Sequence, residues 1–266
     1  MSLTETLAAP SPATSAMLRL SALVVARNEE MQLRDCLSGL AFADEIVVML
    51  DRCHDRSAEI AREFTDRVVE GAWELEGDRR NAGIAACRGE WILEIDADER
   101  VGADLAAEIQ ATITGSAAAW HLIPVDNYVG ERLVRWGWGA SFGRSAYAGL
   151  FRTGAKNWGD QRVHPAISLT GAQGRTLEAR LVHHVDANIS DMLRRLDRYT
   201  TLRAQDLRES GDLGSFAHNL RRIFSRFWKC YVGRRGYREG AWGFLIALCA
   251  GLYPILSYLK ARLEPE

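Results

Sequence analysis

The chain has few cysteines, and none of them stand in a metal-binding pattern. Its five cysteines are scattered over 266 residues and form no C-x-x-C pair. An odd number of scattered cysteines argues against a disulfide framework and against a structural zinc site. The sequence therefore predicts a protein of a reducing, cytoplasmic compartment.

An excess of charge of either sign is also missing. The formal net charge is −2, with 26% charged and 47% hydrophobic residues. This balance gives no general affinity for nucleic acid, so we expect no nucleic-acid partner. The hydrophobic share excludes a wholly disordered chain, and the length allows one substantial α/β domain with an appendage.

The first residues lack the features of a secretion signal. Residues 1–17 contain Pro10, Pro12 and several small polar residues, but no basic segment followed by an apolar core. They predict a disordered tail. We expect residues 18–188 to form one folded domain after it.

What the chain does have is a regular alternation of strands and helices. Buried strands are expected from apolar, β-branched runs at residues 20–26, 45–50, 67–70 and 91–96. Helical spacing of apolar residues follows each run, over about 31–40, 56–64, 78–88 and 103–113. This alternation predicts right-handed βαβ units in an α/β fold with a mainly parallel sheet.

The rest of this domain is less regular. Further strands are expected at 118–125 and 180–185, whereas residues 128–158 are rich in Gly, Trp and Arg and show weak periodicity. Some of these side chains either line an acceptor groove, by stacking on sugars and binding phosphate, or simply anchor loops. They are Arg132, Arg135, Trp136, Trp138 and Arg144.

Acidic and amide side chains directly follow three of the expected strands. Asn28 and Glu29 follow the first strand, Asp51 the second, and Asp96 and Asp98 the fourth. Ligands of parallel sheets bind at the carboxyl ends of the strands, so the pattern predicts a nucleotide pocket there. The alternative is that each residue caps a helix or begins its first turn.

The fourth strand carries the most informative stretch, Trp-Ile-Leu-Glu-Ile-Asp-Ala-Asp-Glu at residues 91–99. Only Ala97 separates Asp96 from Asp98, so both can face one hard cation or one ribose. Carboxylate oxygens suit Mg²⁺ or Mn²⁺, which share their coordination with a substrate phosphate. The alternative is a solvated acidic turn, because short motifs often match by chance.

From Ile189 onwards the composition changes, and residues 189–266 predict a helical C-terminal region. Apolar residues of 189–207 lie on one helical stripe. Residues 220–238 mix arginines with aromatic residues, which suits an anionic bilayer surface; a solvated helix is the alternative.

The following segment, residues 240–259, is uncharged and close to the length of a membrane span. Gly243, Gly251 and Pro254 interrupt it. We therefore predict a helical pair that lies in or dips into the membrane interface, in preference to a true span.

Four motifs in order resemble those of family 2 glycosyltransferases. They are Val-Val-Ala-Arg-Asn-Glu-Glu (24–30), Ile-Val-Val-Met-Leu-Asp (46–51), Arg-Asn-Ala-Gly (80–83) and the 91–99 stretch. Within that family the chain looks like the lipopolysaccharide core glucosyltransferase branch. The resemblance spans about residues 18–108 and continues more weakly through 162–164, 181–184 and 228–242.

This resemblance implies a GT-A fold, a Rossmann-like fold that binds nucleotide-diphospho-sugars, and an inverting sugar transfer. By motif, Asp51 would contact the base of a UDP-sugar donor, and Asn28 and Glu29 would frame the uridine pocket. Arg80 and Asn81 would lie near the base and diphosphate.

For the metal, the resemblance implies a divalent cation, Mg²⁺ or Mn²⁺, at the D-x-D motif. Asp98 would ligate the cation, and Asp96 would meet the ribose or a metal-bound water. The acceptor would be a membrane glycolipid such as lipopolysaccharide core or a related envelope glycan. The protein would associate peripherally with the cytoplasmic face of the inner membrane.

Two positions depart from the family pattern. The usual Asp-Asp or Asp-Ser-Gly-Ser after the second strand is Asp-Arg-Cys-His at 51–54, one residue shorter. The branch often has His-Glu where this chain has His164-Pro165. If that Glu supplies the general base, Asp160 is the first substitute and His164 the second.

Other functions remain as alternatives. A sugar nucleotidyltransferase would need a Gly-rich, basic loop after the first strand, where this chain has Arg-Asn-Glu-Glu at 27–30. A phosphatase with a nucleophilic Asp would need Ser or Thr soon after Asp98, where Glu99 and Arg100 follow. A catalytically silent membrane adaptor could keep the fold without the base.

Overall fold

A nine-stranded sheet in the strand order β3-β2-β1-β4-β8-β6-β11-β5, with β7 paired to β6, forms the centre of the molecule. The computed structural model describes residues 19–139, 142–163 and 165–264, so the predicted tail at 1–17 lies outside the described residues. The strands are β1 (Leu20–Ala26), β2 (Glu45–Asp51), β3 (Val68–Gly71), β4 (Trp91–Asp96), β5 (Glu99–Arg100), β6 (Trp120–Val129), β7 (Arg132–Val134), β8 (Ala146–Arg152) and β11 (Leu181–Asp186). A separate hairpin pairs β9 (Lys156–Trp158) with β10 (Ile167–Leu169).

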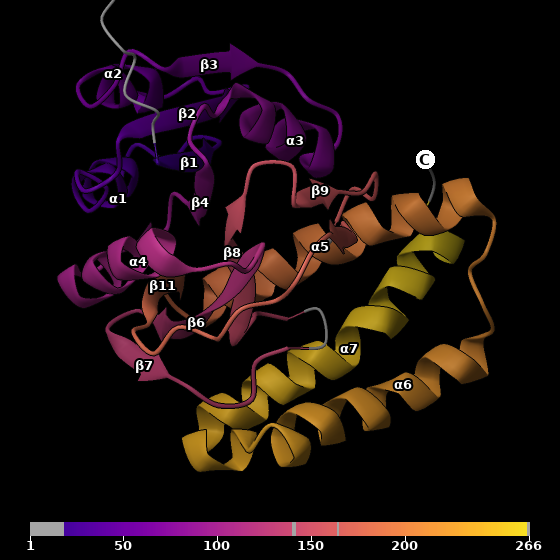
Figure 1. Cartoon of the computed structure of the whole chain (residues 1–266). Helices are drawn as coiled ribbons and strands as arrows, with labels where there is room; N and C mark the ends of the chain where they lie inside the picture. The colour runs from indigo at the N-terminus through magenta and orange to yellow at the C-terminus, as the bar shows by residue number, and fades with distance from the viewer. Residues whose placement is uncertain (1–18, 140–141, 164, 265–266) are drawn as a thin grey trace, which may run out of the picture.

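The first half of the sheet is parallel, as predicted. β1 pairs in parallel with β2 and β4, and β2 pairs in parallel with β3. The helices between these strands are α1 (Leu33–Ser38), α2 (Ser57–Arg62), α3 (Glu76–Ala86) and α4 (Ala103–Gly115). Figure 1 shows these helices around the parallel strands. The predicted α/β architecture is confirmed.

β1 shows why these strands read as continuous apolar runs. Ala22, Val24 and Ala26 belong to the core that includes residues of α1, α2 and α4. Leu23 and Val25 point to the other face, where they pack in a cluster with residues of α3. Both faces of the strand are therefore buried, because helices cover the sheet on both sides.

The second half of the sheet contains a strand that the sequence analysis did not predict. β8 lies between β4 and β6 and is antiparallel to both. It falls within 128–158, where Gly149 interrupts the apolar pattern. A Cβ at Gly149 would lie 2.6 Å from the ring of Tyr147, so the glycine makes room for that ring. The weak pattern reflects this packing, not a loop.

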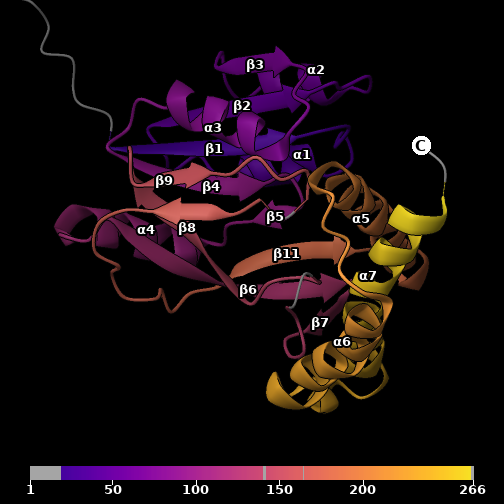
Figure 2. The ribbon, with the colours of Figure 1, turned by 90° about the vertical axis from the view of Figure 1, so that its right-hand side faces the viewer.

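Three helices follow the sheet: α5 (Ile189–Ser210), α6 (Phe216–Trp228) and α7 (Ala241–Leu263). A π-helical turn (Lys229–Gly233) and a 3-10 turn (Gly236–Glu239) connect α6 to α7, so the basic, aromatic segment at 220–238 is not one helix. Figure 2 shows the three helices stacked beside the arrowheads of β6 and β11.

α7 packs closely against its neighbours. A Cβ at Gly243 would lie 1.8 Å from the Gly236 carbonyl oxygen, and a Cβ at Gly251 would lie 2.8 Å from the Ile223 carbonyl oxygen. The glycines that interrupt the apolar segment are thus the positions where backbones approach each other. Within the described residues, α7 is the one helix long and apolar enough to cross a membrane, and 61% of its most apolar window is buried inside the protein. A helix buried to this extent is typical of a protein core.

Glu45, at the start of β2, is a buried carboxylate whose contribution to stability can be measured. Its carboxylate accepts hydrogen bonds from the Ser21 hydroxyl at 2.6 Å and the Arg88 guanidinium Nε at 2.9 Å. Burial would raise the pKa of Glu45, but Ser21 and Arg88 outweigh burial and hold this pKa below its ordinary value of 4.5.

We expect Glu45→Gln to lower the free energy of unfolding at pH 7 by about 2 kcal/mol, because a charged hydrogen-bond acceptor is lost. The ionised Glu45 carboxylate stabilises the fold above pH 4.5. This contribution is lost as the pH falls through the pKa that Glu45 has in the folded protein. Urea unfolding at pH 7 and below pH 4 should therefore show the difference shrinking with acidification. The exposed Glu178→Gln variant is the control, and an equal loss at both pH values would contradict the expectation.

Candidate functional site

A cavity of about 670 Å³ opens at the carboxyl ends of β1, β2 and β4. Residues of α3, of the segment before β8, of β11 and of α5 complete its wall. Five of the residues predicted at strand ends or in the Arg-Asn-Ala-Gly motif line it: Glu29, Asp51, Arg80, Asp96 and Asp98. The structure thus brings together residues that lie up to 69 positions apart in the sequence.

Two other predicted residues lie outside the cavity wall and position its parts. Asn28, with a φ of 56°, accepts a hydrogen bond from the His54 backbone N–H at 2.8 Å and so joins the loops after β1 and β2. Asn81 exchanges two hydrogen bonds, each of 2.9 Å, with the backbone of Trp158. The Asn81 side chain therefore connects α3 to β9.

Asp51 lies at the end of β2 and is 5% exposed. Its Oδ1 accepts hydrogen bonds from the Trp73 backbone N–H at 3.1 Å and from Arg52 Nε at 3.0 Å. The guanidinium groups of Arg27 and Arg79 lie 4.0 and 3.7 Å from Oδ2. Asp51 is thus an ordered, fully compensated carboxylate at the cavity wall.

A buried ion network lies beneath the cavity. Arg80 donates to Glu94 Oε1 at 2.7 Å and to Asp96 Oδ1 at 2.8 Å, and its guanidinium stacks 4.8 Å from the ring centre of Trp158. The Lys156 ammonium, fully buried, donates to Glu94 Oε2 at 2.7 Å. Each buried charge in this network has a partner of opposite sign, which is what makes its burial tolerable.

Asp96 is held by two arginines. Arg80 bonds Oδ1, and Arg144 bonds Oδ2 at 3.1 Å. Burial would raise the pKa of Asp96, but Arg80 and Arg144 outweigh burial and hold this pKa well below its usual range. Asp96 is therefore ionised, and both of its oxygens already have cationic partners.

Arg144 belongs to residues 128–158, whose arginines and tryptophans were expected either to line an acceptor groove or to anchor loops. Its guanidinium also bonds Glu99, which is fully buried, and lies 3.8 Å from the ring centre of Tyr147. Arg144 also lines the cavity, so it both anchors the segment before β8 and faces the cavity. Trp138, in contrast, is 1% exposed and packs in the core with the C-terminal helices.

Asp98 differs from Asp96 in having an unused oxygen. Its Oδ1 is buried and has no hydrogen-bond partner among the described residues, and its Oδ2 lies 3.3 Å from Nε2 of His183 on β11. His183 Nδ1 lies 2.8 Å from the Asn127 amide oxygen, which can only accept a hydrogen bond. A neutral His183 would therefore turn the lone pair of Nε2 towards Asp98.

The electrostatics also fit a cation at this point. Burial alone would lower the pKa of His183, but the Asp98 carboxylate outweighs burial and raises it. Burial and the carboxylates of Asp98 and Asp96 raise the pKa of Glu29 to about 7. The His183 pKa shift, and the part of the Glu29 shift that comes from the two aspartates, reflect the negative charge at Asp98.

An oxygen without a partner, next to an oriented imidazole, fits a divalent cation. Within the described residues, no group of three or more His, Cys, Asp or Glu side chains could hold an ion by itself. Asp98 and His183 would thus supply two ligands, and a substrate or water would have to supply the rest.

Arginines from separate parts of the chain reach the remaining wall. Arg27 and Arg79 lie near Asp51, while Arg195 and Arg198 extend from α5. The Arg195 guanidinium donates two hydrogen bonds, of 2.9 and 2.8 Å, to the Asp186 carboxylate. Arg198 has no ion-pair partner among the described residues, and its guanidinium lies 5.2 Å from the ring centre of Tyr199. Such a wall suits a ligand with several negative charges.

Of the two residues predicted as the general base, Asp160 lies outside the cavity wall and His164 lies outside the described residues. Asp160 is exposed, accepts a hydrogen bond from Gln161 at 2.7 Å and does not line the cavity, although the neighbouring Arg162 does. His164 lies outside the described residues. The general base therefore stays a prediction.

The sequence analysis did not single out His183 or Arg198 as site residues. His183 stood in a weakly matching stretch, Leu-Val-His-His at 181–184, and only the pairing of β11 with β5 and β6 brings it to Asp98. Arg198 lies on the polar side of a helix in which charged residues are common. No local pattern distinguishes it from other exposed arginines.

Comparison with known proteins gives three kinds of match. A family model described as "Glycosyl transferase family 2" matches residues 21–160. The lipopolysaccharide core biosynthesis glycosyltransferase LpsC of Rhizobium meliloti (strain 1021) is 25% identical over 261 residues, which covers 91% of this chain and 92% of that protein. An uncharacterized glycosyltransferase of Rickettsia prowazekii (strain Madrid E) is 21% identical over 257 residues, covering 92% of this chain and 87% of that protein.

Among solved structures, a crystal structure of S. aureus TarS 1-349 matches with a TM-score of 0.48 at 12% identity, covering 91% of each chain. The resemblance inferred from the four motifs is confirmed by the family model, whose matched residues contain all of them.

Arg144 offers a test of the network that holds this site. We expect Arg144→Gln to lower the free energy of unfolding by about 3 kcal/mol, because the buried charges of Glu99 and Asp96 lose a partner. Urea unfolding followed by tryptophan fluorescence measures the change. Arg34→Gln, which breaks an exposed ion pair with Glu63, should have little effect, and equal losses in the two variants would contradict the expectation.

Proposed function

The chain belongs to glycosyl transferase family 2, and from this premise we propose that its strand-end cavity binds a UDP-sugar and transfers the sugar to a glycolipid with inversion. The observation that carries the proposal is the unpartnered Asp98 Oδ1 beside His183, in a cavity whose wall also carries several arginines. Carboxylate, imidazole and arginine groups together suit a cation and a diphosphate.

For the donor, the geometry supports distinct roles around the cavity. Asp51 and Glu29 would contact the uridine, with Asn28 and Asn81 holding the surrounding loops and β9 in place. Asp96, fixed by Arg80 and Arg144, would meet the ribose or a metal-bound water. Arg198 and Arg27 would bind the diphosphate, since charge develops on this leaving group as the sugar departs.

For the cation, we propose Asp98 and His183 as ligands of Mg²⁺ or Mn²⁺. When bound, such an ion acts as a Lewis acid that stabilises charge on diphosphate oxygens. Asn127 orients the His183 imidazole through Nδ1. Proteins commonly fix a ligating histidine in this way through its second nitrogen.

For the acceptor, the reaction needs a group that takes the proton of the attacking hydroxyl. Asp160 is our first choice and His164 the second, because their segment borders the cavity through Arg162 and Pro165. Inversion requires such a base on the face of the sugar opposite to the departing diphosphate.

The C-terminal helices support a membrane-bound acceptor. α6 exposes large apolar side chains four positions apart, with exposed fractions of 50% for Phe216, 41% for Leu220, 73% for Phe224 and 66% for Trp228. We call these four residues the α6 stripe. Exposed arginines and a lysine lie on α6 and in the turns that follow it: Arg221, Lys229, Arg235 and Arg238. An apolar stripe with cationic neighbours suits the surface of an anionic bilayer.

We therefore propose that residues 18–188 carry out the transfer and that residues 189–266 bring them to the cytoplasmic face of the inner membrane. α5 would serve both parts, since Arg198 and Tyr199 line the donor cavity. The acceptor would be a glycolipid such as lipopolysaccharide core or a related envelope glycan. Binding to the bilayer would hold the acceptor close to the site and so lower the entropic cost of the encounter.

Asp98→Asn tests the donor and cation site. We expect consumption of UDP-sugars in the presence of Mg²⁺ or Mn²⁺ to fall by about 100-fold or more, because a ligand charge is lost where several kcal/mol of stabilisation arise. Chelation by EDTA should abolish the wild-type activity, and adding the cation back should restore it. Asp78→Asn, an exposed acid of α3 outside the cavity, is the matched control. Unchanged turnover and cation binding in Asp98→Asn would overturn the proposal.

Asp160→Asn tests the general base. We expect kcat to fall by about 10²–10⁴-fold, with the affinity for UDP unchanged, because Asp160 does not line the donor cavity. The exposed Asp66→Asn variant serves as control. Full activity in Asp160→Asn would exclude this residue, and His164→Ala would then have to abolish turnover.

A further inference from the structure

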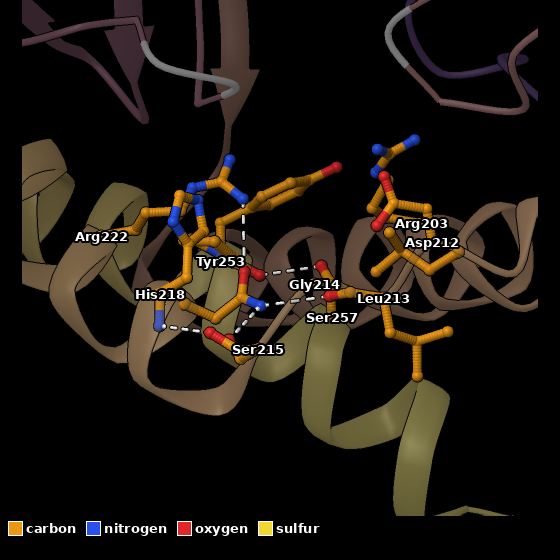
Figure 3. Close-up of a pocket in the computed structure, with 12 residues that line it drawn as sticks. Arg203, Asp212, Leu213, Gly214, Ser215, His218, Arg222, Tyr253 and Ser257 are labelled. Carbon is orange, nitrogen blue, oxygen red and sulfur yellow. Dashed lines mark hydrogen bonds between the residues drawn. The ribbon is translucent and has the colours of Figure 1, made fainter.

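A second cavity, of about 450 Å³, lies between the three C-terminal helices. Its wall comes from the second half of α5, the connection at 211–215, the first turns of α6 and the middle of α7 (Figure 3). Among the described residues, none lines both cavities. α5 separates them, since Leu202 faces the donor cavity and the next residue, Arg203, faces the second one.

Arginines from two helices reach this cavity. Arg203 comes from α5 and Arg222 from α6, with the His218 imidazole beside Arg222. In Figure 3 the side chains of Arg222 and His218 lie beside Tyr253 of α7. Burial and the nearby charge of Arg203 lower the pKa of Arg222. The two guanidinium groups thus repel each other across the cavity.

The neighbouring acids compensate these cations only in part. Asp206 lies 3.6 Å from Arg203, but it also pairs with Arg162 at 3.4 Å. Asp212 lines the cavity without an ion pair among the described residues. The hydrogen bond that Arg222 makes, at 3.3 Å, goes to the neutral amide oxygen of Asn219. Arg222 therefore has no anionic partner among the described residues and is available to a further anion.

The beginning of α6 adds to the positive potential. Ser215 caps this helix, with its hydroxyl accepting a hydrogen bond from the His218 backbone N–H at 3.2 Å. The Asn219 side-chain amide donates to the carbonyl oxygens of Leu213 and Ser215, at 3.2 and 3.1 Å, and holds the connection in place. The N-terminus of α6, a 13-residue helix, thus lies at the cavity with its cap in place and its positive dipole end towards it.

We propose that this second cavity binds the phosphate group of a membrane lipid, with Arg203 and Arg222 as its principal ligands. Guanidinium groups bind phosphate through paired hydrogen bonds, and a helix N-terminus favours the same charge. The cavity volume lies in the range of small-molecule sites, so it accommodates a phosphate together with part of its head group.

The source of the phosphate follows from the neighbouring surface. The α6 stripe begins at Phe216, next to the capping Ser215, and the Phe216 ring lies 6.2 Å from that of Tyr258 on α7. Ser257, the residue before Tyr258, lines the cavity. A lipid whose phosphate occupies the cavity can therefore meet the α6 stripe at Phe216, at the N-terminal end of the helix. This assignment rests on the proposed action of the protein at a membrane.

The test compares vesicles of matched surface charge. The full-length protein is titrated with phosphatidylcholine vesicles that contain either phosphatidic acid, with its exposed phosphate monoester, or phosphatidylglycerol. We expect tighter binding to phosphatidic acid, and we expect Arg203→Gln and Arg222→Gln each to reduce this binding by about tenfold, the effect of losing one charged hydrogen bond. Arg221→Gln, exposed on the same helix outside the cavity, should weaken binding to both vesicles equally.

Two further measurements separate the possible outcomes. UDP-sugar consumption should be unchanged in Arg203→Gln and Arg222→Gln, because neither residue lines the donor cavity. A wild-type protein that consumes the donor but shows no preference for phosphatidic acid would overturn the lipid site and leave the proposed function intact. Preference without any donor consumption would support the lipid site and contradict the proposed function. If glycerol 3-phosphate raised the Tm of the wild type, and phosphatidic acid vesicles bound no better than phosphatidylglycerol ones, the lipid assignment would be wrong.

Discussion

The ion pairs of Arg80 and Arg144 with the end of β4 are the constraint on which the site depends. They hold the Asp96 carboxylate from both sides and leave Asp98, two residues further on, as the carboxylate with an unused oxygen. The two aspartates of the motif therefore differ in what they can bind, although they look equivalent in the sequence. Asp96 is a fixed anion, whereas Asp98 is available to a ligand.

The same network joins the two halves of the sheet. Arg80 belongs to α3 of the parallel half, and Arg144 precedes β8 of the antiparallel half. The Asn127 amide continues the connection, since its nitrogen donates to the Arg144 carbonyl oxygen at 2.8 Å while its oxygen contacts His183. His183 is thus oriented by the element that also positions Arg144. The surroundings of Asp98 and the arginine side of the cavity are therefore built as one unit.

Two of the C-terminal helices, α6 and α7, differ in how far their apolar residues are buried. α7 is largely apolar and packs through glycines against α6 and the 3-10 turn before it, so its hydrophobicity serves the protein core. α6 buries only Asn219 fully and presents its apolar stripe outwards. An exposed stripe is costly in water and has to be explained by an occupant. The helix that exposes its apolar residues is therefore the less hydrophobic of the two.

Much of the parallel half could be predicted because its information is local. Each strand reads as an apolar run, each helix as a 3.6-residue pattern, and the acids after β1, β2 and β4 mark one rim of the sheet. β8 could not be predicted in this way, because Gly149 makes room for the Tyr147 ring and hides the strand pattern.

The sequence by itself determined the strand–helix order of the parallel half, the family and the carboxylates at the strand ends, since these depend on residues close together along the chain. Only the tertiary structure decided which carboxylate is free, which histidine meets it and which helix is exposed. Arg144, His183 and Arg198 come from elements far apart in the chain. Their partners follow from strand pairing and helix packing, which no local pattern encodes.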